Sequence, residues 1–269
     1  MQASLFVTLG MGGLSVLVAS GFVMAYASAV GRTGGNRTYA RMGARTAILA
    51  WMAMFAALAE SGTLAQFDRR PPPLMLAMIV FVVSGLVLGV SRVGTTFVRG
   101  LPLAWLIAAQ GFRLPLELVM HEAAREGVMP VEMSYAGYNI DIVTGASALL
   151  LAWYVRRRGA PSGARAEQQR ASARRIFAWN VLGSVLLAVV VTVAVLASPM
   201  IRAFGDEPAH VNDWVAHFPF VWLGSVLVPS AAFGHVVIFR SLHAARRGVT
   251  ERASGTSSLS ASSDRSSPS

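Results

Sequence analysis

Residues 5–30 read LFVTLGMGGLSVLVASGFVMAYASAV and contain no charged side chain. A helix of about 20 apolar residues crosses the hydrocarbon core of a bilayer, which is about 30 Å thick. Six further apolar stretches follow along the chain. Together these stretches predict seven membrane-spanning segments, at 5–30, 46–66, 74–90, 101–122, 138–155, 176–197 and 218–239.

The composition agrees with this interpretation, because 54% of the residues are hydrophobic, only 13% are charged and the mean hydropathy is +0.54. An ordinary soluble domain carries about a quarter charged residues. In lipid, backbone polar groups must pair within their own segment, so each spanning segment is expected to be a helix. We therefore predict an all-α fold with a seven-helix transmembrane domain at 1–252 and a disordered, Ser-rich cytoplasmic tail at 253–269.

The distribution of Arg predicts the orientation in the membrane. All 23 basic residues are Arg, and 18 of them follow the first, third, fifth and seventh segments, whereas four lie in the loops of the opposite side. Cytoplasmic loops carry the excess of positive charge in membrane proteins. The N-terminus is therefore expected outside and the C-terminus in the cytoplasm. The formal net charge of +10 indicates topology rather than binding to nucleic acid.

The sequence excludes several classes of function. It contains no Lys, which excludes a Schiff base and hence a retinal pigment, and no Cys, which excludes disulfides and thiolate metal sites. Phosphate-binding loops and dinucleotide fingerprints are also missing. Seven helices by themselves therefore do not indicate a rhodopsin.

The fourth predicted segment carries an unusual polar stripe. Gln110, Arg113, Glu117 and His121 follow one another at offsets of three, four and four residues, which places them on one helix face. Arg113 is expected near the bilayer centre, where an unpaired Arg costs at least about 2.5 kcal/mol. Glu117, one turn away, is the nearest predicted partner of Arg113, and pairing across the bundle with an acid of another helix is the alternative.

Other segments bring polar side chains to the same outer half of the membrane: Glu60, Asn139 and Asp141. The expected site is a ligand-binding or ion-pair network of Glu60, Gln110, Arg113, Glu117, His121, Asn139 and Asp141. A purely structural ion-pair network that holds the helices in register is the alternative. A metal site of His121, Glu117, Glu60 and Asp141 is chemically reasonable, and a haem between His121 and His217 is a further alternative. His235 is expected towards the cytoplasmic end of its helix, in a headgroup or helix-end role.

Three stretches, QGFRLPLE at 110–117, PVEMSYAGYNIDIVTG at 130–145 and FPFVWLGSVLVP at 218–229, together with Trp179 and Asn180, resemble a group of uncharacterised bacterial multi-pass membrane proteins. This resemblance implies a bacterial inner membrane and no particular chemistry.

Two classes of function fit these observations. In the first, the protein binds or moves a small ligand or ion, with Arg113 as the partner of an anion or counter-ion and Glu117, Asp141 and His121 as titratable groups. In the second, the same residues form a membrane-embedded enzyme site that faces the periplasm. No nucleophile arrangement and no full metal-binding motif is recognisable in the sequence, which favours the first class. The lipid bilayer is the expected partner, while the cofactor and the oligomeric state stay undetermined.

Overall fold

The structure, a computed structural model, describes residues 3–157 and 166–263, with side chains for 3–157 and 172–246. The helices are α1 (Leu5–Arg32), α2 (Arg37–Glu60), α3 (Pro73–Val90), α4 (Arg92–Gly100), α5 (Leu103–Ala109), α6 (Arg113–Arg125), α7 (Ile142–Arg157), α8 (Ala166–Leu196) and α9 (Val228–Ser263). A 3-10 turn at Gln110–Phe112 joins α5 to α6, and a π-helix at Leu223–Leu227 leads into α9. The predicted all-α class is confirmed, and no strand occurs in the described ranges.

Within the described residues, six segments are long and apolar enough to cross a membrane: Leu5–Arg32, Arg37–Glu60, Pro73–Val90, Leu103–Arg125, Ser172–Leu196 and Leu223–Arg246. The chain is therefore a multi-pass helical membrane protein. The remaining predicted span, at 138–155, corresponds to α7, which is 16 residues long. Residues 138–141, the first four of the predicted span, are not helical, because they belong to the turn that ends at Asp141. The predicted disorder of the tail stays a prediction, and residues 264–269 lie outside the described part.

Helix ends differ from the predicted ones where charged residues continue a helix. Asn36 caps α2 by accepting hydrogen bonds from the backbone N–H groups of Thr38 and Tyr39 at 3.0 and 3.1 Å, so α2 begins at Arg37 rather than at residue 46. Likewise, α9 continues past Arg240, whose guanidinium donates to the backbone oxygens of Gly89 and Ser91. A run of high hydropathy ends at such a charged residue, whereas the backbone hydrogen bonds of the helix continue through it.

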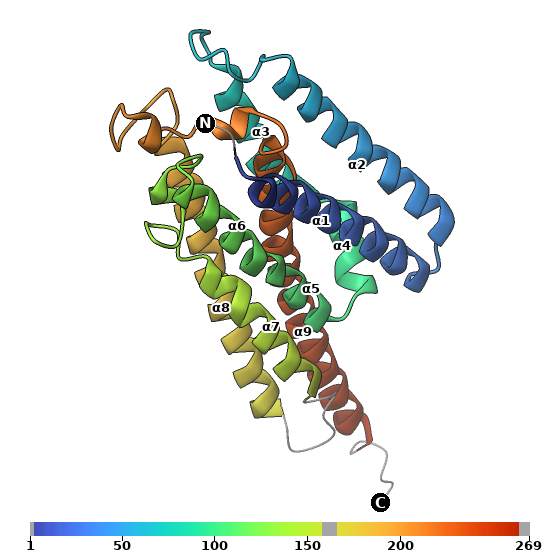
Figure 1. Cartoon of the computed structure of the whole chain (residues 1–269). Helices are drawn as coiled ribbons and strands as arrows, with labels where there is room; N and C mark the ends of the chain where they lie inside the picture. The colour runs from blue at the N-terminus through green and yellow to red at the C-terminus, as the bar shows by residue number, and fades with distance from the viewer. Residues whose placement is uncertain (1–2, 158–165, 264–269) are drawn as a thin grey trace, which may run out of the picture.

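The helices form one bundle in which α9 packs against α3, α4, α5 and α8, and α2 lies at the edge beside α1 (Figure 1). Polar contacts tie the helices together at both ends. The backbone N–H of Ser4 donates to Glu126 Oε2 at 2.8 Å, and Arg32 donates to the carbonyl oxygen of Gly100 at 3.2 Å. The start of α1 therefore lies near the end of α6, and the end of α1 lies near the end of α4.

Close packing of α3 on α9 depends on two glycines. A Cβ added to Gly85 would lie 2.5 Å from the backbone oxygen of Pro229, and one added to Gly89 would lie 2.7 Å from Val236. Small residues at spacing four allow such close approach of helices in lipid.

Pro229 also leaves a backbone carbonyl without its usual helical donor. Pro229 has no N–H to give to the carbonyl of Ser225 four residues earlier, and the indole of Trp51 on α2 donates to that oxygen instead, at 2.8 Å.

Candidate functional site

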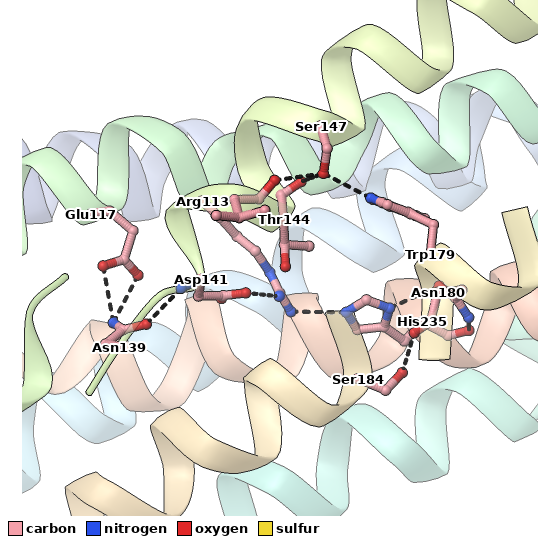
Figure 2. A network of polar contacts seen from close by, with 11 residues as sticks. Arg113, Glu117, Asn139, Asp141, Thr144, Ser147, Trp179, Asn180, Ser184 and His235 are labelled. Carbon is pink, nitrogen blue, oxygen red and sulfur yellow. Dashed lines mark hydrogen bonds and ion pairs between the residues drawn. The ribbon is translucent and has the colours of Figure 1, made fainter. Parts of the chain in front are cut away.

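The centre of the candidate site is an ion pair between α6 and the residue that precedes α7. Arg113, the first residue of α6, donates through Nη1 to Asp141 Oδ1 at 2.6 Å (Figure 2). Arg113 lies near the middle of the candidate span Leu103–Arg125 and is 1% exposed. The hypothesis that Glu117 is its partner is therefore wrong, and the pairing runs across the bundle. The physical reason is that α7 approaches α6 closely enough to bring Asp141 within reach.

Glu117 has a different partner, the amide of Asn139. Asn139 Nδ2 lies 2.9 Å from both carboxyl oxygens of Glu117 and 2.9 Å from the backbone oxygen of Met133. Asn139 Oδ1 in turn accepts a hydrogen bond from the backbone N–H of Asp141 at 3.1 Å. Asn139 thus connects Glu117 to the turn that carries Asp141, and all three residues are buried.

On its other side Arg113 contacts His235 of α9, with 3.1 Å between Nη2 and Nε2. Because a guanidinium can only donate hydrogen bonds, Nε2 must be the acceptor. His235 is then the neutral tautomer with its proton on Nδ1, which donates to Asn180 Oδ1 at 2.8 Å. Asn180 Nδ2 completes the arrangement by donating to the backbone oxygen of His235 at 3.0 Å.

Sequence reasoning placed His235 wrongly, near a helix end. His235 lies mid-way along the span Leu223–Arg246 and is 3% exposed. The predicted segment ended at residue 239 because Arg240 stops the hydropathy signal. A helix continued past Arg240 would have placed His235 at the depth of Arg113. Asn180, also buried, had no role assigned by spacing alone.

Glycines let the helices close around this network. A Cβ at Gly145 of α7 would overlap the backbone N of Leu114, and one at Gly183 of α8 would lie 2.7 Å from His235 Cε1. A Cβ at Gly234 would overlap the side-chain amide of Gln110. Gln110 is buried beside the network, and its Oε1 has no hydrogen-bond partner among the described residues.

Two of the predicted site residues lie apart from the ion pair. Glu60, the last residue of α2, is exposed. The His121 ring stacks on Tyr135, with 4.2 Å between ring centroids, and its Nδ1 has no partner in the described part of the chain. No three His, Asp or Glu side chains within the described ranges gather as a metal site requires. His217, the other ligand of the haem alternative, is exposed.

A cavity of about 80 Å³ adjoins the network. Its polar lining residues are Arg113, Glu117, Asp141 and Asn212. The other lining residues are apolar side chains or Gly, most of them from α3, α6, α8, the π-helix and α9, with Phe112, Met133 and Val215 from 3-10 turns. One water molecule needs about 10–15 Å³ of cavity volume on the same measure, so this cavity has room for several water molecules. Nearly all of the lining surface is apolar, and we call the part of the cavity that Arg113, Glu117 and Asp141 border its charged end.

No family model, curated protein or solved structure matches the chain. The functional argument therefore rests on the geometry of the bundle and its buried charges.

Proposed function

We propose that this protein binds a small ligand or ion in the intramembrane cavity at Arg113, Glu117 and Asp141, and works as a receptor or transport module. The observation that carries the proposal is the cavity itself, which brings three ionisable groups and apolar walls together at the depth of the span centre. Ligand sites in proteins commonly combine apolar walls with a few convergent polar groups.

Energetics support a functional role for these charges. Two charges taken out of water lose hydration that their mutual attraction barely repays, so a buried ion pair adds little to stability over well-packed apolar residues. Ionisable residues within membrane spans are costly and mark ligand or ion sites by default. A network that only fixed helix register would not need a cavity at its charged end.

The test uses the fact that the natural chain contains no Cys. Ala231 and Ala232 are neighbours on α9, each 3% exposed, and only Ala231 lines the cavity. In folded protein in nanodiscs, the thiol of Ala231→Cys should react with the small neutral reagent methyl methanethiosulfonate, while that of Ala232→Cys should stay protected. Intact-mass spectrometry follows both reactions.

A second substitution links the reaction to the cavity. Ala194→Phe, which fills the cavity from α8, should slow modification of Ala231→Cys, whereas Ala188→Phe at an exposed position of α8 should leave it unchanged. Equal protection of the thiols at positions 231 and 232 would mean that small molecules do not reach the cavity, and the proposal would fail.

For the topology we propose that α7 completes a bundle of seven spans, with the N-terminus outside and the C-terminus in the cytoplasm. The excess of Arg on one set of loops supports this arrangement. Figure 1 agrees with it, because the end of α7 and the start of α8 lie at the end of the bundle toward which α9 runs. The bacterial inner membrane is proposed on the resemblance of residues 110–117, 130–145 and 218–229 alone.

Reporter fusions test this topology. Fusions after Arg45, Arg158 and Arg247 should report a cytoplasmic location, and fusions after Arg70, Gly127 and Asp206 should report a periplasmic one. A periplasmic signal from the fusion after Arg158 would show that α7 does not cross the membrane, and the six-span alternative would replace the proposal.

A further inference from the structure

We propose that the ligand of this cavity is an amphipathic organic cation, an ammonium group on a short apolar chain, whose head binds at Asp141 and Glu117. This inference rests on the proposed function and names its ligand class. It starts from the charges that face the cavity and from the hydrogen bonds that they already make.

At the charged end of the cavity, two carboxyl groups face one guanidinium, so electrical neutrality requires one more positive charge or one more proton. The guanidinium is that of Arg113, and the carboxyl groups are those of Glu117 and Asp141. The neighbouring His235 adds no charge, because it accepts from Arg113 and is therefore the neutral tautomer. An uncompensated negative charge among apolar walls is costly, and an ammonium group would supply both the missing charge and hydrogen-bond donors.

The carboxylates can accept further hydrogen bonds from a ligand, because each carboxyl oxygen has two lone pairs, whereas the guanidinium has little left to donate. Both terminal nitrogens of Arg113 are engaged, Nη1 with Asp141 and Nη2 with His235. The Arg113 side chain is 1% exposed, whereas that of Asp141 is 7% exposed. Arg113 Nε, although without a partner in the described part of the chain, is buried and has almost no accessible surface. An anion entering the cavity would therefore meet carboxylate oxygens before it met a free donor.

The walls specify the rest of the ligand. From the charged end, the lining continues as Leu, Val, Met, Phe and Ala side chains. A metal cation needs a shell of oxygen ligands, which these walls do not provide, whereas an alkyl chain gains from apolar contact. The volume of about 80 Å³ suits a head group with a few carbon atoms.

The position of the half-buried lining residues indicates the access route. Met78 and Val82 on α3 and Leu187 and Val190 on α8 line the cavity and are only partly buried. Both helices lie in candidate membrane spans, so their exposed surface faces lipid. An amphipathic amine partitions into the bilayer and can reach the cavity from there between α3 and α8.

The experiment measures protection of the thiol of Ala231→Cys in nanodiscs of neutral phosphatidylcholine. The probes are n-butylamine hydrochloride, sodium butanoate and 1-butanol, which share a similar chain and differ in the head group. Butylammonium should slow modification by methyl methanethiosulfonate severalfold and saturably, and the other two probes should not. In Glu117→Gln the concentration for half protection should rise about tenfold or more, because a hydrogen bond to a charged group is lost.

Controls separate the possible outcomes. Glu122→Gln on the same helix removes a carboxylate that pairs with Arg125 outside the cavity, and it should leave protection by butylammonium unchanged. If Glu117→Gln does not fold, the comparison of butylammonium with butanoate and 1-butanol on Ala231→Cys alone tests the cation assignment, because the three probes differ only in the head group. A thiol at position 231 that reacts but is protected by butanoate or butanol instead would overturn the cation assignment and leave the proposed function standing. A thiol that does not react at all would overturn both.

Discussion

Replacing Asp141 with Asn should lower the free energy of unfolding by about 3–5 kcal/mol, the typical cost of removing one partner of a buried ion pair. The reason is that Arg113, 1% exposed near the middle of its span, would lose the carboxylate that lies 2.6 Å away and keep its charge. The measurement is thermal and denaturant unfolding of purified protein in one detergent at fixed pH. In a double-mutant cycle, Arg113→Met combined with Asp141→Leu should cost clearly less than the sum of Arg113→Met alone and Asp141→Leu alone.

An exposed pair serves as the matched control. Arg125 and Glu122 also form an ion pair, at 2.9 Å, but their side chains are 67% and 34% exposed. In a double-mutant cycle of Arg125 and Glu122, the coupling energy should be about 0–1 kcal/mol, as is usual for surface ion pairs. Additive effects in the cycle of Arg113 and Asp141 would contradict the pairing seen in the structure.

Replacing Gly145 with Val should have the second large effect, a loss of about 3 kcal/mol or more. A Cβ at this position overlaps the backbone N of Leu114 and lies 3.0 Å from the backbone carbonyl carbon of Arg113. Backbone atoms cannot rotate away as a flexible side chain would, so α6 and α7 must separate. Overpacking alone costs about 1–3 kcal/mol, and the separation also weakens the bond between Arg113 and Asp141.

Gly13 of α1 provides the comparison, since no atom lies within 4 Å of its added Cβ. Gly13→Ala should be neutral or stabilising by up to about 1 kcal/mol, because Ala is the better helix former. Equal melting temperatures for Gly145→Val and the natural protein would show that α6 and α7 are not in close contact.

The fold class could be predicted because it depends on local properties of the chain. A run of about 20 apolar residues is sufficient to require a helix in lipid, whichever neighbours it has. Predicted helix ends were less accurate, because Arg37 and Arg240 interrupt hydropathy without interrupting backbone hydrogen bonds. Hydropathy includes the turn before α7 in a span for the opposite reason, since Tyr138 and Ile140 raise the hydropathy but lie outside the helix.

The sequence by itself determined which side chains of α6 share a face, because helical periodicity places Arg113 and Glu117 one turn apart. Only the tertiary structure decided their partners, Asp141 and Asn139, which lie 28 and 22 residues further along the chain. His235, 122 residues from Arg113, joins them because the glycines of α7, α8 and α9 let the helices approach. Periodicity shows the direction in which a side chain points but not which helix packs there, and that depends on the summed contacts of the whole bundle.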